Sequence, residues 1–230
     1  MRFPRSISLA VISAVAAGSM LMAGAPLATA GGGEAVLYTV HGIPGVKVDV
    51  CITGLGEVQS GMKYATRFRE ELVPGTAKIR IRAASKGQCK GALLAAASVS
   101  LVDGDNVTAV ARLVDGDPSI TLFDNDLSPT PLGEFRVTAA HMMKGGPVDV
   151  YLGDAVAINA LDRGNDASVT RSVGLFTIFT TKSGKTTPIL GPRTVTSATE
   201  GSAYTFVMVG TKVENNRFVV FKQPVVTPSA

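Results

Sequence analysis

The only two histidines of this 230-residue chain, His41 and His141, lie one hundred positions apart. Each is followed eight residues later by an aspartate, Asp49 in one place and Asp149 in the other. A histidine paired with a carboxylate can act as a general base or help to hold a metal ion. No nucleophile accompanies either pair at a matching position, so we predict no catalytic residue. We expect each histidine to point inward and to hydrogen-bond the backbone of the following turn.

Both pairs belong to a longer repeated element. In each place the histidine closes an apolar run, a Gly/Pro turn follows, and Val-Asp-Val begins the next segment. The repeat predicts two copies of one domain of about 100 residues, which is enough to bury one modest core. We place the copies at residues 31–124 and 133–226, with a Pro-containing, extended linker at 125–132 and a tail at 227–230.

Short segments rich in β-branched and apolar residues recur in both copies, with turn residues between them. They predict an all-β protein made of two tandem immunoglobulin-like antiparallel β-sandwich domains. The first copy offers Val36–Val40, Val46–Ile52, a weaker Tyr64–Phe68, Lys78–Arg82, Leu93–Leu101, Val107–Val114 and Ser119–Phe123. The second offers Glu134–His141, Val148–Leu152, Ser172–Thr180, Thr194–Ala198, Tyr204–Val209 and Arg217–Phe221. One or two helical turns at Met62–Leu72 are an alternative.

Apolar and polar residues alternate along Val46–Ile52, which assigns the faces of this strand. The valines should face inward, with Asp49 and Cys51 outward.

The only two cysteines, Cys51 and Cys89, both lie in the first copy. The second copy has Tyr151 and about Thr186 in their places, as expected if the cysteines act as a pair. In an exported protein the default is a disulfide, and closing a loop of about 38 residues would stabilise the fold by roughly 4 kcal/mol. A metal-bound or catalytic thiol is the alternative, and it lacks partners because there is no C-x-x-C motif.

The first 30 residues have the plan of a secretory signal peptide. Two arginines precede a weakly apolar core at Ile7–Met22, and the small residues Ala28-Thr29-Ala30 follow. We predict cleavage after Ala30 and a secreted, extracellular protein with no transmembrane segment in the mature chain. The alternative is a membrane anchor, because Ile7–Leu27 is close in length to the ~20 apolar residues that span a bilayer.

The net charge argues against nucleic acid as a partner. The formal charge of +4 includes Arg2 and Arg5, so the chain after Ala30 carries 4 − 2 = +2. Nucleic-acid binding normally needs a concentrated positive charge. Three basic residues do alternate along one strand face, where we expect solvent, with an anionic polymer as the alternative. They are Lys78, Arg80 and Arg82.

Four aspartates beside the predicted linker could gather at one end of the first sandwich, because the strands between them run down and back. Calcium takes about six to eight oxygen ligands, many of them carboxylates. Ordinary Asp-rich turns are the interpretation that we favour, so we predict no metal and no cofactor. The calcium candidates are Asp103, Asp105, Asp124 and Asp126.

Three elements of the first copy stand out together. They are Val40-His41-Gly42-Ile43-Pro44 with Val48-Asp49-Val50, then Leu72-Val73-Pro74-Gly75-Thr76, then Asp124-Asn125-Asp126-Leu127-Ser128-Pro129. In these elements the chain resembles the bacterial domain-of-unknown-function family 4397, in two tandem copies. The second copy departs from the pattern at Met142-Met143-Lys144 and at Ser172-Val173-Gly174. The resemblance implies an exported β-sandwich and brings no activity with it.

These observations predict a secreted, non-enzymatic β-sandwich protein that acts by binding or in association with the cell envelope. Its expected partner is a cell-envelope polymer or protein. Tandem sandwiches on a short linker are commoner in secreted binding and spacer proteins than in enzymes, which is an analogy of folds only. Two alternatives stay open: a secreted hydrolase with a cleft between the domains, and a calcium-dependent adhesion module.

Overall fold

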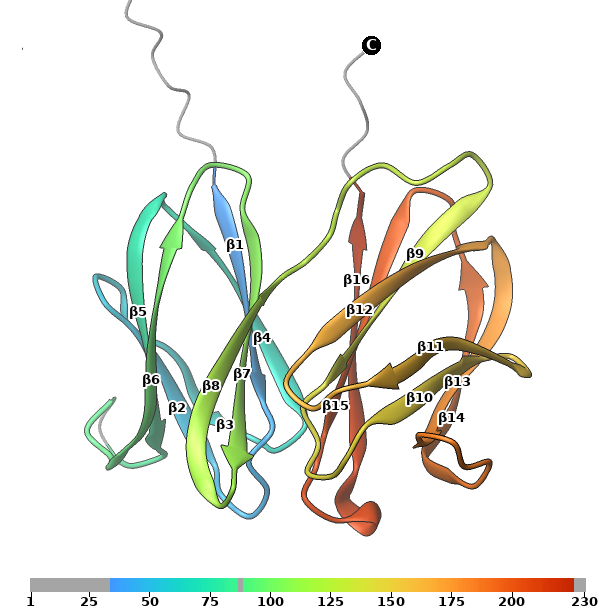
Figure 1. Cartoon of the computed structure of the whole chain (residues 1–230). Coiled ribbons are helices and arrows are strands. Elements are labelled where there is room, and N and C mark those ends of the chain that lie inside the picture. Colours follow the sequence, from blue (N-terminus) through green and yellow to red (C-terminus); the bar gives the residue numbers. More distant parts are fainter. Residues whose placement is uncertain (1–33, 87–88, 226–230) are drawn as a thin grey trace, which may run out of the picture. The chain divides into compact units, whose positions relative to one another are not determined.

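The computed structural model describes residues 34–225 apart from 87 and 88. The predicted signal peptide and the predicted tail lie outside the described residues. Within them the chain forms sixteen β-strands and one short 3₁₀-helix, η1 at Val213–Asn215 (Figure 1). The prediction of an all-β sandwich protein is confirmed. The described residues contain no helix with the length and apolar character needed to cross a bilayer.

Each copy contributes eight strands, arranged as two four-stranded sheets. The first copy forms β1 (Ala35–His41), β2 (Val48–Ile52), β3 (Gly56–Met62), β4 (Thr66–Leu72), β5 (Gly75–Ala83), β6 (Leu93–Leu101), β7 (Asn106–Val114) and β8 (Asp117–Asp124). The second forms β9 (Glu134–His141), β10 (Val148–Leu152), β11 (Ala155–Leu161), β12 (Asp166–Ser172), β13 (Gly174–Lys182), β14 (Pro188–Ala198), β15 (Ser202–Val209) and β16 (Arg217–Pro224).

The two copies pair their strands in the same order. The first copy has the sheets β4-β1-β7-β8 and β3-β2-β5-β6, and the second has β12-β9-β15-β16 and β11-β10-β13-β14. Neighbouring strands are antiparallel except that β1 runs parallel to β7, and β9 to β15. The sheets are thus mainly antiparallel, as predicted, and each copy has one parallel pair that was not predicted. Parallel neighbours need a long connection, and the strands between them supply it.

Three strands were not predicted: β3, β11 and β12. Two of them, with the sequences GEVQSGM and DASVTRS, carry few apolar residues. They are held by the ladders that they form along β2 and β9, and strand preference depends strongly on such neighbours. The alternative of helical turns at Met62–Leu72 is wrong, because β4 pairs with β1 along its full length.

A separate hydrophobic core fills each sandwich. Val50 and Ile79 in the first copy and their counterparts Val150 and Ile178 in the second are all 0% exposed. Burying a side chain of this size contributes about 1.5–3 kcal/mol. The repeated valine pattern thus builds the same interior twice.

Asp49 and Cys51 lie on the face of β2 opposite the core, but they are not exposed to solvent as predicted. Asp49 is 0% and Cys51 4% exposed. The connection from β5 to β6 covers this face, where the Ser85 N–H reaches Asp49 and Cys89 is bonded to Cys51. Asp149 is buried in the same way, at 4%. Alternation identifies the face of a strand but not the loop that covers it.

A third hydrophobic cluster contains residues from both sandwiches, on the sheets that hold β1 and β9. Tyr38 of β1 stacks on Phe221 of β16, with the ring centroids 4.3 Å apart. Arg163 Nη2 also donates to the carbonyl of Leu113 over 2.7 Å. The described parts of both sandwiches therefore belong to one compact unit.

Candidate functional site

Both histidines are buried, and each fixes the turn that follows it. His41 is 0% and His141 1% exposed. Nε2 of His41 lies 2.8 Å from the carbonyl oxygen of Val46, and Nε2 of His141 lies 3.0 Å from that of Gly146. A carbonyl oxygen can only accept, so Nε2 carries the proton in both rings. Each histidine therefore points inward and hydrogen-bonds the backbone of the turn that follows it, as the sequence predicted.

Burial lowers the pKa of both histidines. Desolvation is the main cause for His41, and the hydrogen bond to the Val46 carbonyl opposes it. Desolvation again dominates for His141, where the nearby guanidinium groups of Arg112 and Arg163 lower the pKa further. Both rings are therefore neutral at pH 7 and enclosed, so neither is positioned to act on a substrate.

The lowered histidine pKa values predict an acid-side loss of stability. The unfolded chain binds more protons than the folded chain between pH 6.5 and each lowered value, so stability falls as the pH drops below about 6.5. The slope is at most about 1.4 kcal/mol per pH unit for each histidine. Thermal melts from pH 7.5 to pH 5 should show it, and a His41→Gln/His141→Gln variant should lose most of the slope. An equal slope in that variant would contradict the prediction.

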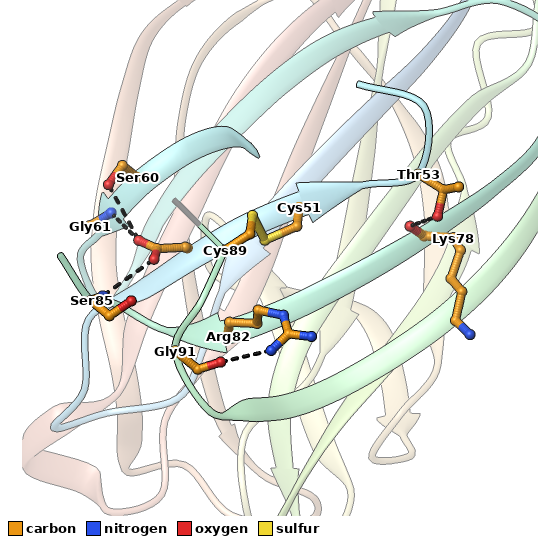
Figure 2. The surroundings of a disulfide bond; sticks show 10 residues. Cys51, Thr53, Ser60, Gly61, Lys78, Arg82, Ser85, Cys89 and Gly91 are labelled. Atoms are coloured by element: carbon orange, nitrogen blue, oxygen red, sulfur yellow. Dashed lines mark hydrogen bonds between the residues drawn. A yellow bond between two sulfur atoms is a disulfide. The ribbon is translucent and has the colours of Figure 1, made fainter. Parts of the chain in front are cut away.

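Asp49 accepts hydrogen bonds from the backbone of two segments of the first sandwich. Figure 2 shows their donor residues, Gly61 and Ser85, near the disulfide. Its Oδ1 accepts the N–H of Gly61 over 2.9 Å, and its Oδ2 accepts the N–H of Ser85 over 3.3 Å. The hydroxyl of Ser60 lies 3.3 Å from the same Oδ1. We call this arrangement the aspartate clasp. It ties the end of β3 to the connection between β5 and β6.

Asp149 forms the same clasp in the second sandwich. It accepts the N–H groups of Ala160 and Gly184, both over 2.8 Å. Burial alone raises the pKa of Asp149, but these N–H donors outweigh burial and hold the pKa below its usual value. Ala160 adopts φ +49, and its counterpart Gly61 adopts φ +57. Both copies therefore keep a left-handed residue here, which glycine accepts more readily than alanine.

The hollow between the sandwiches does not contain a hydrolase constellation. It is lined by Lys144, Arg163 and Lys212 with Asp115, and neither histidine borders it. The only hydroxyl in its lining belongs to Thr211. A hydrolase site in this hollow would therefore have no histidine to act as its general base.

The predicted disulfide between Cys51 and Cys89 is confirmed (Figure 2). It joins β2 to the connection between β5 and β6, with the two Cα atoms 6.1 Å apart. Arg82 supports the same connection by donating from Nη1 to the carbonyl of Gly91 over 2.7 Å. The disulfide and the aspartate clasp thus both attach the connection between β5 and β6 to β2.

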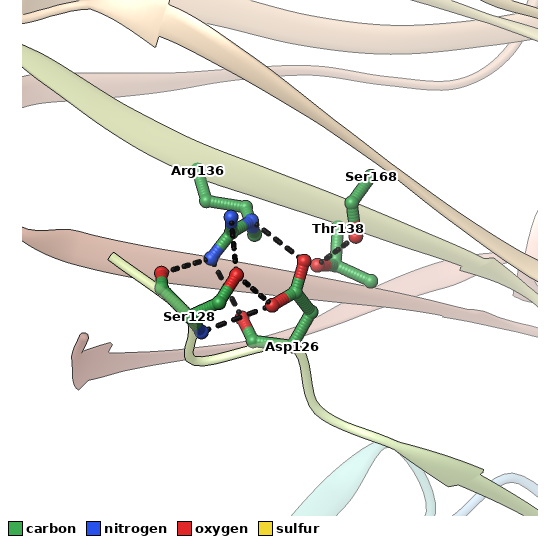
Figure 3. Close-up of polar contacts among 5 residues, drawn as sticks. All are labelled: Asp126, Ser128, Arg136, Thr138 and Ser168. Carbon is green, nitrogen blue, oxygen red and sulfur yellow. Dashed lines mark hydrogen bonds and ion pairs between the residues drawn. The ribbon is translucent and has the colours of Figure 1, made fainter. Parts of the chain in front are cut away.

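The segment expected to be a linker is anchored to the second sandwich. Arg136 of β9 pairs through Nε with Asp126 Oδ2 over 3.0 Å, and donates from Nη1 to the Ser128 carbonyl over 2.6 Å (Figure 3). Burial raises the pKa of Asp126, but hydrogen bonds from Ser128 and the charge of Arg136 outweigh it and lower that pKa. Asp126 is thereby turned toward an arginine rather than toward the other calcium candidates.

The remaining calcium candidates do not assemble a site. Asp105 accepts the N–H of Val102 over 2.7 Å, and it lines one hollow together with Asp124. Asp103 is outside the lining of that hollow. No three His, Cys, Asp or Glu side chains among the described residues are grouped as a metal site would require. The calcium-dependent adhesion module stays a prediction without structural support.

The outer faces of the two copies differ although the strands correspond. β5 pairs with β2 in the same register in which β13 pairs with β10. On β5 the outward positions are basic: Lys78, Arg80 and Arg82. On β13 the corresponding positions are uncharged: Thr177, Phe179 and Thr181. The cores and clasps repeat, whereas these faces do not.

Tyr151 and Phe179 stack on the outer face of the second sandwich. Their ring centroids are 4.6 Å apart, and the ring planes differ by 10°. Val156 lies opposite Tyr151 on β11 and is 44% exposed, which extends the apolar row. This pair was not predicted from the sequence. Comparing the outward residues of the two copies would have found it, since Tyr151 replaces Cys51.

A hollow of about 330 Å³ lies beside Phe179. Its lining combines one aromatic ring, two prolines, a hydroxyl and one carboxylate: Gly153, Asp154, Thr177, Phe179, Pro188 and Pro192. The pairing of β14 with β13 shifts between Ile178 and Thr180. Such irregularities redirect side chains, and they recur beside functional sites. We take this hollow and the stacked rings as the candidate binding site.

No protein-family profile matches this chain, and no curated protein matches it. Solved structures resemble it distantly. CBMbc (family CBM26) from Eubacterium rectale Amy13K in complex with maltoheptaose is 13% identical over 84% of this chain and 98% of its own, with a TM-score of 0.27. A candidate cell adhesion protein from Bacteroides uniformis is 7% identical over 84% of this chain and 99% of its own, with a TM-score of 0.25. The resemblance to family 4397 stays a prediction.

Proposed function

We propose that this protein is an exported, non-enzymatic binding module whose partner is a polymer of the cell envelope. The observation that carries the proposal is the divergence of the two outer sheet faces. The copies keep the same cores, buried histidines and aspartate clasps, but one outer face is basic and the other is uncharged. On that second face Tyr151 and Phe179 are half-buried and Val156 is exposed. Because the two copies differ mainly in these outer faces, we infer that each face contacts a different part of the partner.

The residues that could do chemistry support a non-enzymatic role. Both histidines donate to backbone carbonyls, and Asp49 and Asp149 accept backbone N–H groups. The histidines and aspartates of the repeated element therefore stabilise the backbone of turns and connections. A general base must instead reach the proton that it removes.

Export is supported by the disulfide, because such bonds persist in oxidising compartments and are rare where thiols are kept reduced. The clasp and the bond both fix the connection that covers the outer face of the first sandwich. A rigid surface loses less conformational entropy when it binds.

The basic face suits an anionic component of the envelope. Lys78 is exposed and Arg80 is half-buried. Neither forms a salt bridge with an acid in the part of the chain that the structure describes. Unpaired cations on a sheet face attract anionic polymers, with a strength that falls as salt rises.

A sedimentation assay tests the proposal. The chain from Gly31 onward is mixed with cell-envelope material that has been stripped of protein and lipid, and the retained fraction is measured at rising salt. We expect retention of the wild type, and about tenfold weaker binding for Lys78→Gln/Arg80→Gln, since each lost ion pair is worth up to about 1 kcal/mol.

The matched control is Lys182→Gln/Lys185→Gln, which removes the same charge from the end of β13 and the connection that follows it in the second sandwich. It should bind like the wild type. Failure of the wild type to sediment with the stripped envelope would overturn the proposed function. Equal retention of the Lys78→Gln/Arg80→Gln and wild-type proteins would remove the basic face from it.

A further inference from the structure

We propose that the hollow beside Phe179 binds a sugar unit of a neutral polysaccharide chain. This inference rests on the proposed function and names the ligand class of the second sandwich. It depends on the orientation of the Phe179 ring, on the mixture of groups around it, and on the charge of the site.

Phe179 is only partly covered by its neighbours: it is half-buried and lines the hollow. In the sheet β11-β10-β13-β14, the strands β10 and β14 flank β13 on opposite sides. Tyr151 on β10 covers one face of the ring. On its other side β13 pairs with β14, which contributes Pro188 and Pro192 to the same hollow. The stacked Tyr151 ring restrains Phe179, which prepares the surface before binding.

The lining of the hollow matches the two kinds of surface on a pyranose ring. A pyranose has C–H groups on its faces and hydroxyl groups around its edge. The electron-rich face of an aromatic ring attracts the weakly positive C–H groups. Asp154 supplies a carboxylate that can accept from the sugar hydroxyls, and Thr177 supplies a hydroxyl that also lies 3.3 Å from the hydroxyl of Thr194.

The charge of the site selects against anionic ligands. Asp154 is the one ionisable residue in the lining, and it is exposed. A carboxylate repels phosphate, sulfate and uronate groups. Quaternary ammonium ligands are typically bound in cages of several aromatic rings, whereas Phe179 is the one aromatic residue in this lining. A neutral chain fits both observations.

The size of the hollow fits a short part of a chain. Its volume of about 330 Å³ is at the lower end of the range of roughly 300–1,000 Å³ found for small-molecule sites. The hollow is bordered by three exposed residues, Asp154, Pro188 and Pro192. The rest of a polymer chain can therefore extend from the hollow into solvent. We therefore expect each sugar unit to bind weakly. The overall binding becomes stronger when one polysaccharide chain binds several protein molecules at once.

Affinity electrophoresis of the chain from Gly31 onward tests the inference. Native gels containing dextran, laminarin or hydroxyethyl cellulose are compared with gels containing dextran sulfate, which shares the dextran backbone but is anionic. We expect at least one neutral polymer to retard the protein. Phe179→Leu, which keeps an apolar side chain but removes the ring, should weaken that retardation about tenfold.

Two further variants make the result specific. Asp154→Asn should also weaken retardation by the neutral polymer, because a carboxylate accepts stronger hydrogen bonds than an amide. Leu175→Ala is the control: Leu175 is 69% exposed on the same strand but does not line the hollow. It should migrate like the wild type, and melting temperatures verify that each variant is folded.

The outcomes separate this inference from the proposed function. Retardation by no neutral polymer, or equal retardation of Phe179→Leu and wild type, overturns the sugar site. Retardation by dextran sulfate alone, lost in Lys78→Gln/Arg80→Gln, also overturns it while leaving the envelope-binding module in place. Failure to sediment with stripped envelope overturns the proposed function independently of any sugar result.

Discussion

Replacing both Cys51 and Cys89 by alanine is expected to lower the free energy of unfolding of the first sandwich by about 4 kcal/mol. The bond closes a loop of 38 residues that contains β3, β4 and β5. Without it the unfolded chain gains conformational freedom. The connection that covers Asp49 also loses its covalent attachment to β2. Urea denaturation of the variant and the wild type under non-reducing conditions measures the difference.

Reduction of the wild type should reproduce most of this loss, because it breaks the same bond without changing the sequence. Tyr151→Ala is a useful comparison, since Tyr151 occupies the position of Cys51 in the second sandwich. Removing its aromatic contact should cost only about 0.5–1.5 kcal/mol beyond the lost apolar burial. A loss below about 1 kcal/mol for the double cysteine variant would show that the disulfide contributes little to this fold.

The architecture was largely predictable because local alternation and the tertiary core agree along β2 and β10. Val48 and Val50 face the core as their spacing indicates. β3 and β12 were missed because their own residues carry little strand signal and their conformation comes from the partner strand. The parallel pairing of β1 with β7 was also beyond local reasoning, since it joins residues about seventy positions apart, such as Val36 and Asn106.

The candidate site was harder to predict than the fold. The repeated His–Asp spacing drew attention to residues that stabilise turns, because polar side chains needed by the backbone look the same in a sequence as those needed for chemistry. The stacked pair Tyr151 and Phe179 comes from two strands, and its hollow depends on an irregular pairing of β13 with β14. Sequence spacing reports neither property. A comparison of outward residues between the copies would have identified the pair.

Replacing Asp149 by alanine is expected to cost about 3 kcal/mol of folding free energy. The substitution removes two charge-assisted hydrogen bonds, to the N–H groups of Ala160 and Gly184. Such bonds are worth about 1.5–3 kcal/mol each. We take the lower end because Ala160 and Gly184 are exposed, so that water replaces part of the loss. Urea denaturation measures the cost, and hydrogen exchange should show the amides of Ala160 and Gly184 losing protection.

The pH dependence of folding stability distinguishes the contribution of the Asp149 charge from that of the packing of its side chain. The pKa of Asp149 is lowered in the folded protein, so the unfolded chain binds more protons as the pH falls below about 3.8. The stability advantage of the wild type over Asp149→Asn should therefore be full above that pH and shrink below it. Asp154→Ala, at an exposed position two residues after β10, should change stability by less than about 0.5 kcal/mol. If Asp149→Ala behaved like Asp154→Ala, the clasp would not hold the second sandwich together, and the repeated Val-Asp-Val element would need another explanation.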